Sequence, residues 1–429
     1  MSTTHHFNGI DMNHPAVRAA SALCASLFVT TASATDGYFS HGVGVKAQGI
    51  GGVGIALPQD ALAAAANPAG TAWVGDRLDA GLSWFAPTRS ADVVGNGVPG
   101  ANGHYDGNGK KNFFIPEFGY VKQLSGTTTL GVAVYGNGGM NTDYPKNPYA
   151  AFGSSGNAGV DLIQVFISPS VAYKLDERNA IGAAINLAHQ RFSANGLGAF
   201  SPISSAPGSL TNRGNDSANG LGLRLGWNGH VTPQLTLAAS WASKIKTGEF
   251  DQYRGLFAQA GSFDIPATFG LGLAYQLVPA LTLAADVQKI KYGSVAAVAN
   301  PLSNLFAGNP LGSANGPGFG WRDITVVKAG ASYAASKELT LRAGYNHAGQ
   351  PIPSDQTFFN ILAPGVVQDH LTLGATWQTP GAGELSLHYG RAFNKTVHGA
   401  NAIPAPFGGG SANISLSEQT LGVAYGWKL

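Results

Sequence analysis

The segment LTLAASW, residues 235–241, decides the fold class of this chain. Its bulky residues Leu235, Leu237 and Trp241 share one parity, and small or polar residues stand between them. This is the period of a β-strand that buries one face and presents the other. The same pattern returns at residues 281–287, 339–345 and 371–377, which read LTLAADV, LTLRAGY and LTLGATW. The chain is therefore predicted to be built from alternating strands.

Fourteen such segments can be placed, each long enough for a tilted strand to cross a bilayer, which takes about nine to eleven residues. An even number of antiparallel strands is typical of bacterial outer-membrane barrels. The fold class is therefore predicted as all-β, a 14-stranded antiparallel transmembrane β-barrel. The predicted strands are 76–90, 112–124, 127–137, 160–175, 179–193, 218–231, 234–247, 264–277, 281–293, 321–335, 338–348, 367–378, 383–396 and 413–428.

The connections between these strands alternate between short turns and long loops. Ser125-Gly126 and Thr232-Pro233 are examples of the turns, whereas loops such as 138–159 and 194–217 are about twenty residues long. Single-chain barrels use short turns on the periplasmic side and long loops outside. Both ends of the barrel are therefore predicted to face the periplasm.

Composition agrees with a barrel and excludes other classes. Only 11% of the 429 residues are charged, 60 are glycine, and no later run of about 18 apolar residues could form a membrane helix. A soluble β-sandwich would expose a very large apolar face to water. A net charge of +2 gives no support for nucleic-acid binding.

Aromatic residues provide an independent indication of a membrane barrel. They share the parity of the apolar residues in their strands, as expected for girdles at the membrane interfaces. The last strand alternates up to Leu429 and resembles the signal read by the barrel assembly machinery, with Leu in place of the commoner Phe. We expect a monomer in contact with outer-membrane lipid and lipopolysaccharide. The girdle residues are Trp84, Tyr120, Tyr173, Trp227, Trp241, Tyr275, Tyr333, Tyr345, Trp377, Tyr389 and Trp427.

Residues 1–34 are predicted to be a cleaved signal peptide. Arg18 precedes a short apolar core, and Ala32-Ser33-Ala34 forms a small-residue cleavage site. Translation could start at Met1 or at Met12. The apolar core is too short for a membrane anchor, and Cys24, the only cysteine, would be removed with the signal.

Residues 35–75 do not alternate and are rich in glycine and alanine, which suits a plug inside a barrel formed by residues 76–429. Gly42, Gly44 and Gly49, the Pro58-Gln59-Asp60 turn, and above all Asn67-Pro68-Ala69 resemble the N-terminal hatch of the FadL/TodX family of outer-membrane channels. The resemblance covers nearly the whole mature chain. It implies a hatch in the lumen, uptake of hydrophobic small molecules, no cofactor and no enzymatic activity. Long-chain fatty acids are the first candidate substrate and aromatic hydrocarbons the second.

The strand parity also predicts the charged lining of the lumen. A basic excess there could orient a carboxylate headgroup, with arginine the better bidentate partner. The alternative is that these charges pair with one another and with the hatch. The headgroup candidates are Arg224, Lys244, Lys328 and Arg342, accompanied in the same parity by Lys246, His388, Asp286 and Glu384.

The resemblance further implies a kink in the third strand that opens the barrel wall for sideways exit, and outer loops that capture substrate. Gly136, Gly138 and Gly139 could permit such a kink, although they could equally mark the end of a strand. Apolar residues in the outer loops favour binding. The capture candidates are Met140, Tyr144, Tyr149, Phe152, Leu197, Phe200 and Ile203.

Three other functions compete with hydrophobic uptake. A general porin is disfavoured because a plug and apolar loops would hinder ions and sugars. A hydrolase has only Ser386 and His388 to support it, with no orienting acid identifiable. The glycines of residues 49–54 satisfy a dinucleotide-binding pattern, but no βαβ unit surrounds them. No metal site is predicted.

Overall fold

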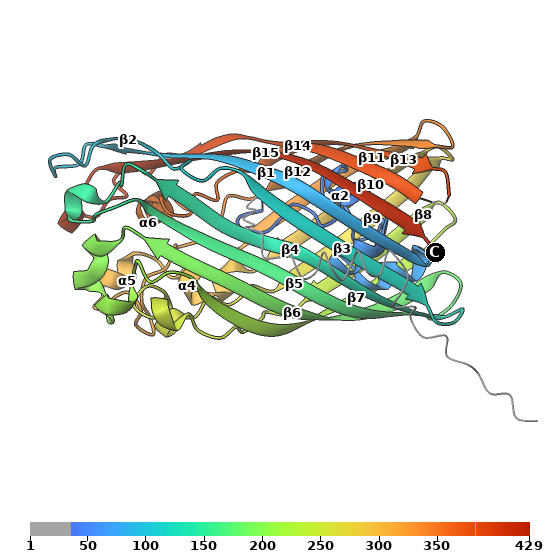
Figure 1. Cartoon of the computed structure of the whole chain (residues 1–429), viewed down its shortest axis with the longest axis horizontal. Helices are drawn as coiled ribbons and strands as arrows, with labels where there is room; N and C mark the ends of the chain where they lie inside the picture. Colours follow the sequence, from blue (N-terminus) through green and yellow to red (C-terminus); the bar gives the residue numbers. More distant parts are fainter. Residues whose placement is uncertain (1–35, 382) are drawn as a thin grey trace, which may run out of the picture.

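A closed barrel of antiparallel strands forms the molecule in the computed structural model, which describes residues 36–381 and 383–429. The predicted signal peptide, with Met12 and Cys24, lies outside the described residues. From β3 to β15 each strand pairs with its neighbours in sequence, β1 pairs with β3, and β15 pairs with β1 to close the wall (Figure 1). The strands are β1 Arg77–Val94, β2 Gly103–Asp106, β3 Phe113–Gln123, β4 Thr128–Tyr144, β5 Ala158–Lys174, β6 Asn179–Asn195, β7 Asp216–His230, β8 Leu235–Ala242, β9 Thr268–Val278, β10 Leu281–Ile290, β11 Ile324–Ala334, β12 Leu339–Ala348, β13 Asp369–Thr379, β14 Gly383–Val397 and β15 Ser411–Lys428.

The alternation decides which face each residue takes. In β8, Leu237 stands beside Leu273 of β9, while the next residue of β8, Ala238, is buried on the inner face. Leu271 is 67% exposed on the outer wall, as are bulky apolar residues of most other strands. Such a belt is stable only when lipid covers it.

The predicted fourteen-strand antiparallel barrel is confirmed, with differences at three strands. The short β2 pairs only with β1 and was not predicted. β4 continues to Tyr144, seven residues beyond the predicted end. β8 ends at Ala242, not at residue 247, because the chain then leaves the regular ladder and makes single bridges such as Ile245 with Ile265. Lys246 is consequently exposed and does not face the lumen.

Short turns gather at the barrel end that carries the C-terminus, and the long loops gather at the other end (Figure 1). Several loops contain short helices that turn back over the barrel opening. None of the helices in the described part of the chain is long and apolar enough to cross a membrane. The loop helices are η3 Ala150–Phe152, η4 Gly198–Ile203, η5 Pro207–Ser209, η6 Asp251–Tyr253, α3 Ala258–Gly261, η7 Tyr292–Ser294, α4 Ala296–Ala299, α5 Ser303–Phe306, η8 Ser354–Gln356, α6 Thr357–Asn360 and η9 Ala405–Phe407.

Residues 36–76, here called the N-terminal segment, contact strands on opposite sides of the wall. α2 (Val45–Gln48) packs against β13 and β14, whereas η1 (Ala61–Ala65) packs against β3 and β4. η2 (Pro68–Trp73) contacts β5, β6 and β7. One segment can touch all of these strands only from within the barrel, where Figure 1 shows it.

Candidate functional site

Buried carboxylates of the wall hold the N-terminal segment by its backbone. Glu117 of β3 accepts hydrogen bonds from the amides of Gly44 (3.1 Å) and Val45 (2.9 Å). Asp286 of β10 accepts from the amides of Gly54 (2.8 Å) and Ile55 (3.1 Å). These four amides lie outside regular structure or at the start of α2, so the wall supplies the partners that the segment itself lacks.

An ion-pair network fixes the middle of the segment. Lys46 pairs with Glu384 of β14, which also pairs with Arg77 of β1. Arg77 binds Asp79 at 2.7 Å, and Asp79 in turn accepts from the amide of Ala61 at 2.9 Å. All these charged side chains are buried, so each depends on its partners. Burial lowers the pKa of Lys46 from its ordinary value.

The Asn67-Pro68-Ala69 motif ties two parts of the segment to the wall. The Asn67 amide group donates to the carbonyls of Ile55 (3.0 Å) and Trp227 (2.9 Å), and its oxygen caps η2 at the Ala69 amide (3.1 Å). A Cβ placed at Gly226 of β7 would lie 1.8 Å from that oxygen, so the wall needs glycine there. The motif therefore holds the N-terminal segment against the barrel wall by hydrogen bonds.

The glycines of residues 49–54 serve the same close approach. Gly49 faces Gly374 of β13, and a Cβ added at Gly49 would lie 2.9 Å from the Cα of Gly374. Gly51 has φ +76°, a backbone conformation that favours glycine. The helix next to these residues, α2, precedes them, so the arrangement that a dinucleotide site requires is not present here.

The expected headgroup residues are engaged with protein groups. Lys328 donates to the His41 carbonyl at 2.7 Å, and Arg342 binds the Gln59 side chain at 2.7 Å. Arg224 lies 3.4 Å from the Ala66 carbonyl. Lys244 pairs outside the segment, with Asp264 at 2.9 Å. Lys328, Arg342 and Arg224 therefore agree with the alternative hypothesis, in which the charges of the lumen hold the N-terminal segment.

A bulge at Asn137 interrupts β4 where the sequence has its glycines. The register with β5 shifts between Gly136 and Gly138, and the segment pairs with the bulge through Ser40 N to Asn137 O (3.1 Å) and Gly139 N to Tyr38 O (3.0 Å). A Cβ at Gly138 would lie 2.0 Å from the Tyr38 carbonyl oxygen. An extra residue reverses the facing of all later residues.

This reversal corrects two of the capture residues. Met140 and Tyr144 are predicted in an exposed outer loop, but β4 continues through them and turns both inward, with 4% and 0% exposure. The Tyr144 hydroxyl donates to the Ile361 carbonyl at 2.8 Å, inside the barrel.

The wall is incompletely paired beside the bulge. β3 pairs with β4 only from Phe118 to Gln123, and higher up β1 pairs with β2 instead of β3. Beyond Val134, β4 forms a continuous hydrogen-bonded pairing only with β5. On its other edge the described residues make only single bridges. Phe85, Phe113 and Ile115 pack together at this opening and close it with side chains.

Two apolar pockets lie at the end of the barrel that carries the long loops. The first, here called the outer pocket, is lined by residues that include Leu197, Phe200, Phe257 and Phe359. Phe200 also packs on Tyr149, with ring centroids 4.8 Å apart. Tyr149 and Phe152 do not line this pocket. Both pack edge-on against the ring of Phe358. Ile203 packs against the same core.

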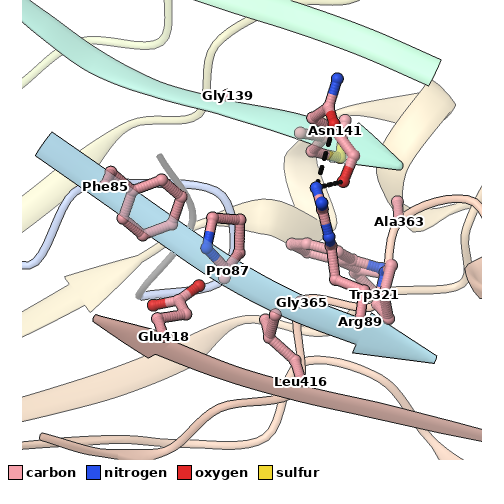
Figure 2. Close-up of a pocket in the computed structure, with 13 residues that line it drawn as sticks. Phe85, Pro87, Arg89, Gly139, Asn141, Trp321, Ala363, Gly365, Leu416 and Glu418 are labelled. Atoms are coloured by element: carbon pink, nitrogen blue, oxygen red, sulfur yellow. Dashed lines mark hydrogen bonds between the residues drawn. The ribbon is translucent and has the colours of Figure 1, made fainter. Parts of the chain in front are cut away.

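The second pocket, here called the wall pocket, lies between β1, β4 and β15 (Figure 2). It is lined by Phe85, Met140, Trp321 and Leu416 together with two charged residues. Trp321 donates to Asn360 at 2.6 Å, and Asn360 donates to the Phe319 carbonyl at 2.6 Å. This contact joins the two loops that separate the wall pocket from the outer pocket.

Several residues of this site were not predicted: Glu117, Arg77, Arg89, Trp321 and Glu418. A sequence signal exists for three of them, since Arg89, Glu117 and Glu418 are charged residues at inward positions of alternating strands. Arg89 binds the Asn141 carbonyl at 2.7 Å and its side chain at 2.9 Å.

The hydrolase hypothesis finds no support in the geometry. Ser386 bonds to Thr376 at 2.8 Å, and His388 lies 3.3 Å from Thr420. Both contacts run to neighbouring strands instead of joining the serine to the histidine. Among residues 36–381 and 383–429, no cluster of three His, Cys, Asp or Glu side chains could hold a metal ion.

Comparison with known proteins identifies the family. The profile described as outer membrane protein transport protein (OMPP1/FadL/TodX) matches residues 30–402. No curated protein sequence matches the chain. Similar solved structures include the toluene transporter TodX of P. putida (18% identity, TM-score 0.66, 91% of this chain and 99% of that chain). Others are a Pseudomonas aeruginosa FadL homologue (16%, 0.69, 91% and 99%) and the Ralstonia pickettii toluene transporter TbuX (18%, 0.61, 90% and 98%). At these identities the structures show a shared fold, while the profile covers most of the sequence, so the chain belongs to the OMPP1/FadL/TodX family of outer-membrane transporters of hydrophobic compounds.

Proposed function

We propose that the protein takes up hydrophobic small molecules through capture in the outer pocket, transfer to the wall pocket and sideways release at the opening beside β4. The observation that carries this proposal is the adjacency of the two pockets. Phe319 and Leu362 line the outer pocket, and their near neighbours Trp321 and Ala363 line the wall pocket. A ligand moving between them needs only local movement of two loops.

Capture depends on burial of apolar surface. The outer pocket is lined by apolar and aromatic side chains, and each buried CH₂ of a ligand contributes about 0.8 kcal/mol. This favours long-chain fatty acids and aromatic hydrocarbons alike. Because Lys328, Arg342 and Arg224 hold the N-terminal segment, none of them is a dedicated partner for a substrate carboxylate. The uptake assay below therefore compares a fatty acid with an aromatic hydrocarbon.

Transfer would be controlled by the start of the N-terminal segment. Tyr38 packs against Trp321 (5.8 Å between ring centroids) and Tyr292 (5.0 Å), and Gly37 lines the wall pocket. Movement of these residues would change the size of the pocket. The segment also makes the general porin less favourable, because it occupies the lumen. Large, steady ion channels formed by the purified protein in planar bilayers would contradict hydrophobic uptake.

Release is tested by closing the wall opening reversibly. A Cβ at Gly136 would lie 3.0 Å from Cγ2 of Ile115. Because Cγ2 is one bond away from the Ile115 Cβ, the two Cβ atoms lie no farther apart than the roughly 4.5 Å that a disulfide allows. We expect the double variant Ile115→Cys with Gly136→Cys to take up radiolabelled oleate and toluene poorly when oxidised and normally after reduction with dithiothreitol. Each single variant is the control.

Equal uptake by the oxidised and reduced double variant would remove the sideways exit. The described residues contain no native cysteine that could interfere. The same assay reports the substrate class, because oleate and toluene are measured side by side. This design is preferable to filling Gly138 with valine, which would also displace the N-terminal segment at Tyr38.

A further inference from the structure

One side chain is out of place in the wall pocket. Phe85, Met140, Trp321 and Leu416 give it an apolar lining, but the carboxyl group of Glu418 also lines it (Figure 2). Glu418 points inward from β15 and is only 1% exposed. An inward acid on a strand is ordinary in a wet lumen, but here most of the lining is apolar, and Arg89 and Asn141 are the other polar side chains in it.

Neither carboxyl oxygen of Glu418 has a hydrogen-bond partner in the described protein. The nearest cationic side chains do not supply one. The Arg89 guanidinium is directed to Asn141 and to the Lys110 carbonyl, and the His370 Nε2 atom is 3.9 Å from the carboxylate, beyond hydrogen-bond distance. The wall carboxylates Glu117 and Glu384 are engaged by protein groups, and Asp286 has one oxygen bonded and one without a partner.

A buried polar group without a partner is costly, and native proteins rarely keep one without a role. Glu418 differs from the structural carboxylates because its free oxygens border a pocket that can admit a ligand. A pure hydrocarbon bound there would leave the carboxyl group unsatisfied. An ionised fatty acid headgroup would bring a second carboxyl group beside Glu418, and the Arg89 guanidinium in the same lining is already bonded to Asn141 and the Lys110 carbonyl.

We propose that the wall pocket binds compounds with an apolar body and a neutral hydroxyl end, of the alkanol or phenol class, whose hydroxyl hydrogen-bonds to Glu418. This inference rests on the proposed function and narrows its substrate class. The ring or chain lies against Phe85, Met140 and Leu416. A site built to hydrogen-bond a hydroxyl rejects analogues that lack it more strongly than an apolar site distinguishes methylenes.

The test compares p-cresol with p-xylene, in which a methyl group replaces the hydroxyl, on the purified full-length protein by titration calorimetry. The quantity compared between variants is the ratio of the p-cresol affinity to the p-xylene affinity. Partition of the ligands into detergent affects this ratio equally in every variant. We expect Glu418→Leu to lower this ratio by about tenfold, because the ligand hydroxyl then loses its hydrogen-bond partner in a buried site. Glu418→Gln retains hydrogen-bonding atoms and should keep most of the ratio. Leu416→Ala, the control for apolar lining, should weaken both ligands without changing the ratio.

A second measurement needs no variant. In the unsubstituted protein, 4-methylanisole, which has the oxygen but no hydroxyl hydrogen, should bind about tenfold more weakly than p-cresol. Equal affinities for these two, or the same p-cresol to p-xylene ratio in Glu418→Leu, would overturn the inference while binding itself still supported the proposed function. If none of the three ligands bound, the proposed function would fail as well.

Discussion

The two halves of the barrel interior are filled by opposite means. Near the end with short turns, the N-terminal segment is held by directed polar contacts, from Glu117, Asp286 and Glu384 to amides or cations. Near the end with long loops, aromatic rings such as Phe200 and Phe358 pack at centroid distances of about 5 to 6 Å. Polar contacts specify one position, whereas apolar packing has no direction and adapts to a guest.

This difference suits the two tasks that we propose. A segment that must block the lumen needs a single, well-defined position. A site that receives hydrophobic molecules of varied shape needs surfaces that can repack. Breaking a buried ion pair is costly, while exchanging one apolar side chain for another of similar size changes stability only slightly. The predictions below test this contrast, beginning with the largest effect.

Replacing Glu384 by alanine should give the largest effect, because it leaves Lys46 and Arg77 buried without their shared carboxylate. Loss of one partner in a buried pair costs about 3 to 5 kcal/mol. We expect faster hydrogen exchange of residues 42–60 and a higher ion conductance in planar bilayers. Glu338→Ala is the control, because Glu338 is exposed in a turn and its side chain bonds to the neighbouring Ser336. Unchanged exchange in Glu384→Ala would show that the ion pairs do not hold the segment.

Acidification should loosen the same half of the barrel. Burial, with Lys328 nearby, lowers the pKa of His41 to about 4, while in the unfolded chain it is 6.5. Between these values the detached imidazole binds a proton and the docked one does not, so docking weakens as pH falls from 6.5 towards 4, by up to about 3 kcal/mol. The titratable groups near His41 are Lys328 of β11, His370 of β13 and His388 of β14, and Lys328 in turn pairs with Asp36.

The measurement is bilayer conductance at pH 7 and at pH 4.5. The unsubstituted protein should conduct more at the lower pH, and His41→Gln, which cannot titrate there, should show a smaller increase. If both proteins responded to pH to the same extent, other groups would be responsible.

The smallest effect is expected from Phe200→Leu in the aromatic half. Phe200 touches Tyr149, Phe359 and Phe407, and leucine keeps the pocket apolar. An apolar exchange of this kind costs less than about 1.5 kcal/mol. Conductance should not change, and uptake of oleate or toluene should fall by less than about tenfold. Phe200→Asp, which buries a charge at the same position, is the contrasting control. A leak caused by Phe200→Leu would abolish the distinction between the halves.

The alternation seen in residues 235–241 determined most of the architecture by itself. Side-chain facing has a period of two, so strand positions, barrel closure and the lipid-facing belt follow from local sequence. The Asn67-Pro68-Ala69 motif pointed to the N-terminal segment through its resemblance to the FadL/TodX hatch, and the structure shows that Asn67 caps η2 there.

Only the tertiary structure decided what each inward residue contacts. Gly136, Gly138 and Gly139 marked a possible kink, but only the structure shows that the bulge at Asn137 reverses the facing of Met140 and Tyr144. Lys328 and Arg342 bind the N-terminal segment, and Glu418 lies without a partner beside a pocket, through contacts between residues hundreds of positions apart. A strand fixes the direction of its side chains, but the group that meets each one is supplied by the rest of the chain.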